Sequence, residues 1–169
     1  DLWFRRYTEH GLLEYALHGT ERVNRGGIGI LEDGSGSMSG EREIWAKGIG
    51  LALLKIAMMQ KRSFFAIHFG GTGEYKLFDY DTSNPTLLKV KTVDNKGNRE
   101  ELTGIEAVLS YAECFFAGGT CFHTPLALAL QHMQEENKEK GCIESDIVFL
   151  TDGQAGLSDS FMANLREER

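Results

Sequence analysis

The sequence predicts one domain of the α/β class, in which strands and helices alternate. Apolar runs of strand length stand at 27–33 and 146–151, and patterns of helical period stand between them at 41–60 and 105–115. The composition agrees, because 41% of the 169 residues are hydrophobic and only 2 are proline. A chain of this length can bury about 70% of its unfolded surface, which is enough for one core.

Residues 1–26 are expected to form a lead-in to the domain, which occupies 27–169. We expect a short helix near 2–10 and a strand near 12–18. The aromatic side chains of this segment are too apolar to remain in water, so it should pack on the domain or on a part of the protein upstream of it.

The first core strand, 27–33, leads through a loop into a helix at 41–60. A helix that is apolar on most sides should be covered on both, and we expect this of 41–60. One face of this helix carries the apolar residues Trp45, Ile49, Ala52, Leu53 and Ile56. Much of the rest of its surface is also apolar, with Leu51, Leu54 and Met58.

Strands at 63–69 and 74–80 are separated by the glycine-rich turn 70–73, which is the pattern of a β-hairpin. The polar stretch 81–103 is expected to be a solvent loop or a small inserted hairpin with its turn at 94–97. The sheet is therefore expected to be mostly parallel, with one antiparallel hairpin strand.

Apolar spacing at 105–115 predicts an amphipathic helix. Thr124-Pro125 then provides an N-cap and a first-turn proline for the next helix, whose charged end should lie in solvent. The last strand, 146–151, is followed by a loop and by a helix expected at about 159–168.

The loop after the first strand carries three oxygen-bearing side chains at alternate positions, Asp33, Ser35 and Ser37. Gly34 and Gly36 let the backbone curl so that these oxygens converge on one point. Oxygen ligands without Cys or His suit a hard cation such as Mg²⁺, and Mn²⁺ fits the same oxygens. The spacing excludes an EF-hand loop, a dinucleotide-binding fingerprint and a nucleophile elbow. The loop also fits a simple serine-rich turn that caps the following helix.

Two later segments point to the same edge of the sheet. Gly118-Gly119-Thr120 forms a glycine-rich loop, and Asp152 follows the strand-like run 146–150. Ligands of a parallel α/β sheet gather at the carboxyl ends of its strands. Asp33, Thr120 and Asp152 are therefore expected to meet there.

This pattern, which runs from about Gly27 to the C-terminus, resembles the metal-ion-dependent adhesion site of von Willebrand factor type A (VWA) domains. The resemblance implies a doubly wound, Rossmann-like sheet with helices on both faces. A complete domain of the family continues with at least one more strand and helix, so the C-terminal strand and helix are expected to be missing from this sequence. The implied metal ligands, some direct and some through water, are Asp33, Ser35, Ser37, Thr120 and Asp152.

Hydroxyl ligands are neutral, so the ion would keep enough positive charge to accept an acidic oxygen from another molecule. The resemblance thus implies a non-enzymatic, Mg²⁺-dependent domain that binds an Asp or Glu of a partner protein. Residues 39–57 and the segment Phe4-Arg5-Arg6-Tyr7 are similar to a bacterial intracellular branch of the family whose members work beside MoxR-type AAA+ ATPases. This similarity implies a cytoplasmic role with such an ATPase in assembling or remodelling other complexes.

Two positions depart from the family pattern. Glu32 stands where the family usually has an apolar or small residue, and the period of two directs it to the opposite side of the strand from Asp33. It is either a partly buried charge that needs a partner or a sign that the strand has ended. Cys121 stands where the family often carries an acidic residue, which removes one potential acceptor beside the metal.

The net charge of −7 argues against nucleic acid as a partner, and no run approaches the roughly 20 apolar residues of a membrane span. Three cysteines without C-x-x-C spacing favour reduced thiols in the cytoplasm. Two alternatives remain open for the function. One is a structural VWA-like domain with a vestigial metal site. The other is a Mg²⁺-dependent phosphotransferase or hydrolase with Asp33 as nucleophile, which is disfavoured because Ser35 stands where such phosphatases place a second Asp.

Overall fold

The structure, a computed structural model, describes residues 26–84, 87–140 and 145–157. Within them, six strands form one sheet in the order β5-β4-β3-β2-β1-β6. The elements expected at 2–10, 12–18 and 159–168 lie outside the described residues. The strands are β1 (Ile28–Asp33), β2 (Phe64–Phe69), β3 (Tyr75–Asp81), β4 (Lys89–Asp94), β5 (Arg99–Thr103) and β6 (Asp146–Leu150).

The sheet is mixed. β1 runs parallel to both of its neighbours, β2 and β6. β2, β3, β4 and β5 follow one another in antiparallel order. The α/β class is confirmed, and so is the hairpin of β2 and β3. The expectation of one antiparallel strand was wrong, because the stretch 81–103 joins the sheet as β4 and β5. Three strand pairs are therefore antiparallel, and both β3 and β5 run opposite to β1.

The alternation of side chains in β4 explains why this polar stretch extends the sheet. Val90 and Thr92 are buried, whereas Lys89 and Lys91, which alternate with them, are exposed. A strand with one face on the core and one face in solvent has this period of two. The overall polarity of 81–103 hides the alternation, although the turn falls at 94–97 as predicted.

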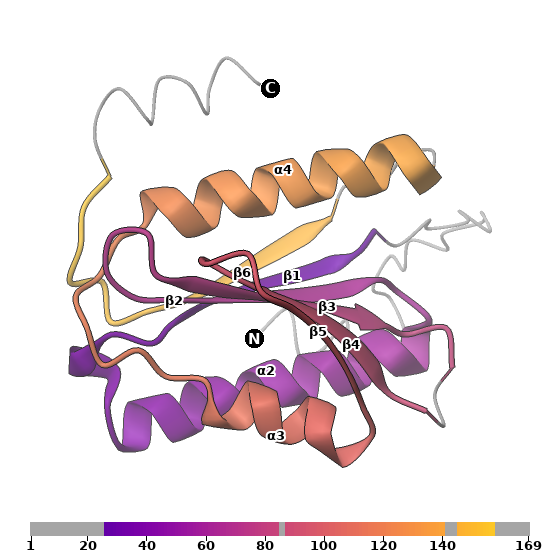
Figure 1. Ribbon diagram of the computed structural model, residues 1–169, viewed down its shortest axis with the longest axis horizontal. Helices are drawn as coiled ribbons and strands as arrows, with labels where there is room; N and C mark the ends of the chain where they lie inside the picture. The colour runs from indigo at the N-terminus through magenta and orange to yellow at the C-terminus, as the bar shows by residue number, and fades with distance from the viewer. Residues whose placement is uncertain (1–25, 85–86, 141–144, 158–169) are drawn as a thin grey trace, which may run out of the picture.

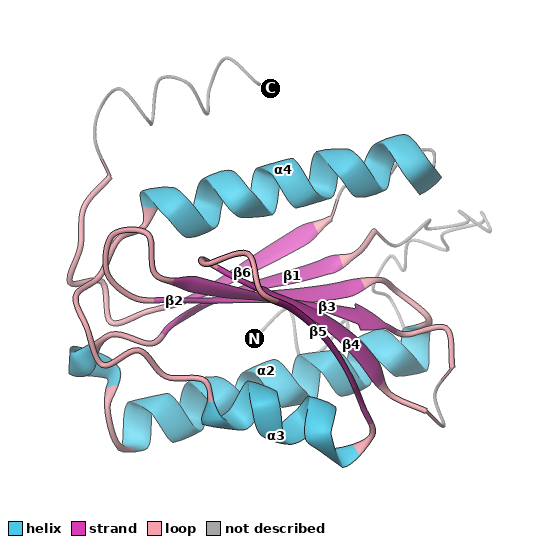
Figure 2. Ribbon diagram, in the orientation of Figure 1, coloured by secondary structure: helices cyan, strands magenta, loops and turns pink. Residues whose placement is uncertain are grey.

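Helices cover both faces of the sheet (Figure 1, Figure 2). α4 (His123–Lys140) lies on one face, and α2 (Glu41–Gln60) and α3 (Ile105–Glu113) lie on the other. Alternate residues of β1 enter the two cores: Ile30 packs in the cluster that includes residues of α2 and α3, and Leu31 packs in the cluster that includes residues of α4. Asp33 therefore shares the side of Leu31, and Glu32 shares the side of Ile30.

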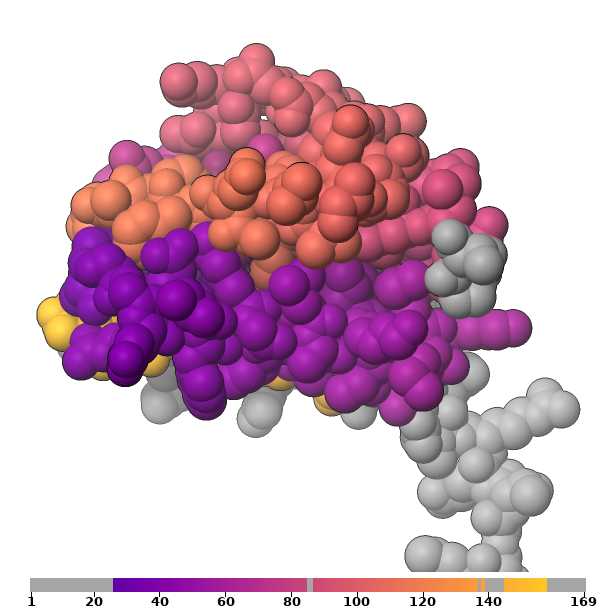
Figure 3. Space-filling view, turned by 90° about the horizontal axis from the view of Figure 1, so that it is seen from below, coloured from indigo at the N-terminus to yellow at the C-terminus, as the bar shows by residue number. Residues whose placement is uncertain are grey.

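Part of the apolar surface of α2 that was expected to be covered is exposed. Figure 3 views the molecule from the side of α2 and α3, where 66% of Trp45 and 41% of Ile56 are exposed. Among the described residues nothing covers these side chains, so the expected burial on both sides is not seen there. Small residues decide the orientation, because they allow the helix to approach the sheet closely. The buried residues of α2 are Ala46, Lys47, Gly50, Leu54 and Ala57.

None of the helices in the described part of the chain combines the length and the apolar character needed to span a membrane.

Candidate metal centre

The ends of β1 and β6 bring two predicted ligands to one edge of the sheet. Asp33 is the last residue of β1, and Asp152 lies two residues beyond the end of the parallel neighbour β6. Between them, Thr151 Oγ1 donates a hydrogen bond of 2.7 Å to Asp33 Oδ2. This edge lies at the left of Figure 1, where β1 leads into the 3-10 turn η1 (Gly36–Met38).

The loop after β1 holds the first three predicted ligands close together. Asp33 is only 2% exposed, and its Oδ1 accepts the backbone N–H of Ser35 at 2.9 Å. The Ser35 hydroxyl lies 3.2 Å from the hydroxyl of Ser37, which is exposed. Each Asp33 oxygen thus receives one hydrogen bond and keeps a lone pair for another ligand.

The glycine-rich loop before α4 lies directly against this loop. The Gly36 amide donates to the Gly118 carbonyl at 2.9 Å, and the amides of Phe116 and Ala117 donate to the Gly34 carbonyl. A side chain would be tight there, since a Cβ atom built on Gly36 would stand 3.2 Å from the Ala117 oxygen and one on Gly34 would stand 3.3 Å from the Phe69 oxygen. Gly34 and Gly36 thus favour the close approach of the two loops, in addition to any curling of the backbone.

Thr120 belongs to this second loop and is half-buried. The loop is anchored on its other side by the Cys121 amide, which donates to the Gly70 carbonyl at 2.9 Å. Glu74 lies beside this loop, and its carboxylate accepts a hydrogen bond from the Gly71 amide. A Cβ atom added to Gly118 would stand 2.8 Å from the same carboxylate. The contacts thus bring the segment that carries Thr120 to the Asp33 loop.

Arg42 lies at the open side of the site, a position that the sequence analysis did not single out. Its Nη1 donates to the Ser37 carbonyl at 3.2 Å and lies 3.4 Å from Asp152 Oδ2. The Asp152 side chain is 9% exposed, whereas that of Arg42 is 61% exposed. The positively charged guanidinium of Arg42 therefore contacts two residues of the predicted set of metal ligands.

The donor set suits a hard cation. Two carboxylates and three hydroxyls supply oxygen alone, which is the preference of Mg²⁺. In the parts of the chain that the structure describes, no three His, Cys, Asp or Glu side chains gather to hold a metal ion. The predicted site is of another kind, because its Ser and Thr ligands carry no charge.

Glu32 is a buried carboxyl on the opposite face of β1, as its position in the strand predicts. The Tyr111 hydroxyl of α3 donates to Glu32 Oε2 at 2.6 Å. Burial raises the pKa of Glu32 to about 7, although the Tyr111 hydrogen bond and the charge of Lys47 act in the other direction. The strand continues through Asp33, so Glu32 is a buried group with a partner and does not mark an early end of β1.

His68 stands opposite Glu32 in β2 and is fully buried. Its ring packs edge-on against Tyr111 with the centroids 4.4 Å apart. Burial and the charge of Lys47 lower the pKa of His68 to about 3, so the imidazole is neutral at physiological pH. His68 is a packed residue of the core beneath α2 and α3 and does not reach the face that carries Asp33.

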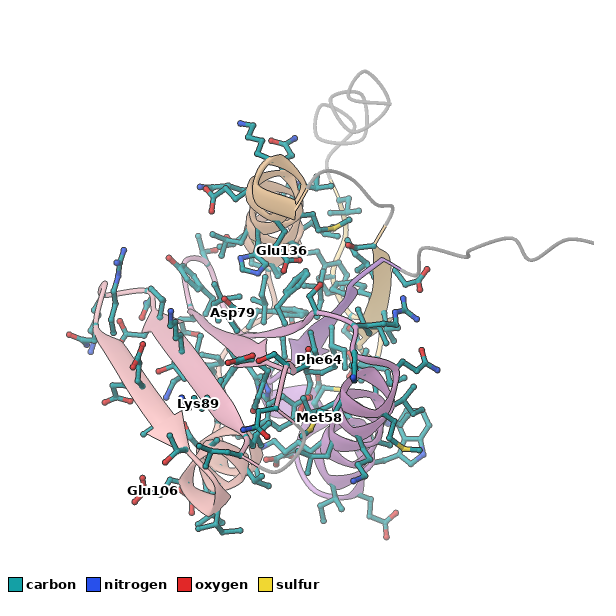
Figure 4. The ribbon with its side chains drawn as sticks, turned by 90° about the vertical axis from the view of Figure 1, so that its right-hand side faces the viewer. Met58, Phe64, Asp79, Lys89, Glu106 and Glu136 are labelled. Atoms are coloured by element: carbon teal, nitrogen blue, oxygen red, sulfur yellow. The ribbon has the colours of Figure 1, made fainter. Side chains whose placement is uncertain are left out.

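A groove of about 890 Å³ lies at the opposite edge of the sheet, near the start of β1 and the end of α2. Figure 4 views this end, with Asp79, Lys89 and Glu136 around it. Its lining includes both acidic and basic side chains and none of the predicted metal ligands. The candidate metal centre is thus separate from the groove.

Comparison with known proteins places the chain beside proteins without an assigned function. It is 30% identical over 166 residues to the uncharacterized protein MJ0077 of Methanocaldococcus jannaschii, covering 98% of this chain and 35% of that protein. It is also 30% identical over 160 residues to the uncharacterized protein MJ0811 of the same organism, covering 95% of this chain and 31% of that protein. The chain therefore spans about a third of the length of these relatives. No protein-family model matches the chain.

Proposed function

We propose that this chain is a VWA-like domain that binds Mg²⁺ and, through the ion, a carboxylate of a partner protein. The proposed ligands are Asp33, Ser35, Ser37, Thr120 and Asp152. The observation that carries the proposal is the hydrogen bond from Thr151 to Asp33, because it joins the ends of β1 and β6 at the loop where the hydroxyl donors stand. The helices on both faces of the sheet support the doubly wound, Rossmann-like arrangement that this proposal includes.

The ion would act as an electrostatic bridge. Its neutral hydroxyl ligands leave it more positive than a cage of carboxylates would, which favours an acidic oxygen as the last ligand. By the same resemblance, the longer protein works in the cytoplasm beside a MoxR-type AAA+ ATPase, in assembling or remodelling other complexes.

A specific observation also favours the structural alternative, in which the site no longer binds metal. Arg42 already places a cation beside Asp152 and so satisfies part of the charge that an ion would otherwise balance. In that case the domain would fold and bind its partners without a divalent ion. The enzymatic alternative has no such support, since Ser35 stands two residues after Asp33 where a second carboxylate would be required.

A titration with Mn²⁺ tests the proposal. Binding is followed by water-proton relaxation, because Mn²⁺ is paramagnetic and fits the same oxygen donors as Mg²⁺. We expect one saturable site in the wild type, its loss in the double variant Asp33→Ala with Ser35→Ala, and its retention in the control Glu101→Ala on β5. Circular dichroism checks that each variant is folded. Equal binding in all three proteins, or no binding in the wild type at millimolar Mn²⁺, would favour the structural alternative.

A further inference from the structure

The position of Arg42 sets a problem that the proposed metal site does not explain. Arg42 stands in the first turn of α2, directly after the loop that carries Ser35 and Ser37. Its guanidinium contacts the Ser37 carbonyl and Asp152 Oδ2, and both residues belong to the proposed donor set. A cation on Asp152 and the guanidinium of Arg42 would repel each other at such distances, so Arg42 competes with an ion for Asp152.

The side chain of Arg42 has room to leave Asp152. It is 61% exposed, and its contacts with Ser37 and Asp152 are long, at 3.2 Å and 3.4 Å. Although Asp152 is only 9% exposed, the contact is weak, because water screens the largely exposed guanidinium and holding the long side chain in place costs entropy. An ion that binds Asp152 would therefore displace the guanidinium at little cost.

A displaced Arg42 would stand at the rim of the metal site with its charge unpaired. The guanidinium has five N–H donors in a planar fork that matches a carboxylate. Hydrogen bonds between a guanidinium and a carboxylate are among the stronger ones in proteins, because both groups are charged. The same side chain could then bind the second oxygen of a carboxylate whose first oxygen is on the ion.

We infer that Arg42 couples metal binding to recognition of a partner's carboxylate, by pairing with Asp152 in the metal-free site and with the incoming carboxylate in the metal-loaded site. This inference rests on the proposed function. Arg42 acts as a specificity-determining residue: it opposes the ion when no acidic partner is present and favours acidic over neutral ligands once the ion is bound.

Two opposite effects of Arg42→Gln follow. The variant lacks the competitor for Asp152, so it should bind Mn²⁺ about two- to fivefold more tightly than the wild type, the range expected for loss of one weak ion pair. It also lacks the second contact for a carboxylate, so it should bind acetate at the loaded ion more weakly, by about the same factor or more.

The experiment measures both effects with Mn²⁺ and sodium acetate as the probes. Mn²⁺ is titrated into the wild type, Arg42→Gln and the matched control Lys55→Gln, and acetate is then added at constant ionic strength with chloride as the reference salt. Acetate that replaces a water on Mn²⁺ lowers the water-proton relaxation. Lys55 is exposed on the same helix but contacts neither Ser37 nor Asp152, so Lys55→Gln makes the same change of net charge away from the site.

The expected result is tighter Mn²⁺ binding and a higher acetate midpoint in Arg42→Gln, with Lys55→Gln equal to the wild type. If Mn²⁺ binds to the wild type and is lost in Asp33→Ala with Ser35→Ala, but Arg42→Gln behaves as Lys55→Gln does, the inference is overturned and the proposed function stands. If the wild type does not bind Mn²⁺, the proposed function fails and the inference fails with it.

Discussion

The contact between α2 and α3 makes a sharp prediction about two glycines of one helix. Gly50→Ala should destabilise the domain, whereas Gly48→Ala should stabilise it. Gly50 is buried against Tyr111, and Gly48 is exposed with no atom within 4 Å of the place of its Cβ. Both changes replace glycine with alanine and so raise the helix propensity of α2 equally. The difference between their unfolding free energies therefore reports the packing alone.

The size of the effect follows from the geometry. A Cβ atom on Gly50 would lie 1.8 Å from Tyr111 Oη, so Tyr111 or α2 must move. Overpacking of this kind costs about 1–3 kcal/mol, and loss of the Tyr111 hydrogen bond to buried Glu32 costs about 1–3 kcal/mol more. Alanine restores about 1 kcal/mol of helix preference at either position. We therefore expect Gly50→Ala to lose about 3 kcal/mol of unfolding free energy and Gly48→Ala to gain up to about 1 kcal/mol.

Urea unfolding followed by circular dichroism measures both free energies. An unfolding midpoint of Gly50→Ala equal to or above that of Gly48→Ala would refute the reasoning, because it would mean that α2 does not approach Tyr111 closely. Adding Tyr111→Phe to Gly50→Ala provides an internal check. It removes the nearest clashing atom, so it should cost less stability in the Gly50→Ala background than in the wild type.

Three further predictions concern the buried carboxyl, the turn between β4 and β5, and the metal. Burial raises the pKa of Glu32 from 4.5 to about 7, so between these pH values the folded protein keeps a proton that the unfolded chain has released. The stability of the wild type is therefore unaffected by this carboxyl below pH 4.5 and decreases as the pH rises from there through about 7. Glu32→Gln should thus be more stable than the wild type by about 3 kcal/mol at pH 8 and equal to it at pH 4, in urea unfolding with a chelator present; a difference that does not vary with pH would contradict this. Gly97 has a φ of 80° in the turn, so Gly97→Ala should cost about 1 kcal/mol and Gly97→Asn less, and equal melting temperatures for all three proteins would exclude this strain. Mg²⁺ at ten times its dissociation constant should raise the unfolding free energy of the wild type by about 1.4 kcal/mol and leave that of Asp33→Ala unchanged. If calorimetry showed the same rise in melting temperature for both proteins, Mg²⁺ would bind elsewhere.

The sequence by itself was informative where local chemistry decides the structure. The period of two in β1 predicted that Glu32 and Asp33 face opposite ways, and the glycine-rich turn between β2 and β3 predicted their hairpin. The turn at 94–97 was predicted for the same reason, since a few residues with special backbone preferences determine a turn. The alternate spacing in the loop after β1 likewise predicted that its side-chain oxygens lie close together, as the hydroxyls of Ser35 and Ser37 do.

Only the tertiary structure decided which surfaces meet. α2 is apolar on most sides, so periodicity could not choose its buried face, and the fit of Gly50 beneath Tyr111 did. β4 and β5 joined the sheet because a neighbouring edge was available to them, which no local pattern records. The pairs Tyr111 with Glu32 and Arg42 with Asp152 join residues 79 and 110 positions apart. Such contacts depend on how whole elements pack, so the chemistry proposed for this edge of the sheet rests on residues that sequence spacing found and on an arginine that only the fold brought to them.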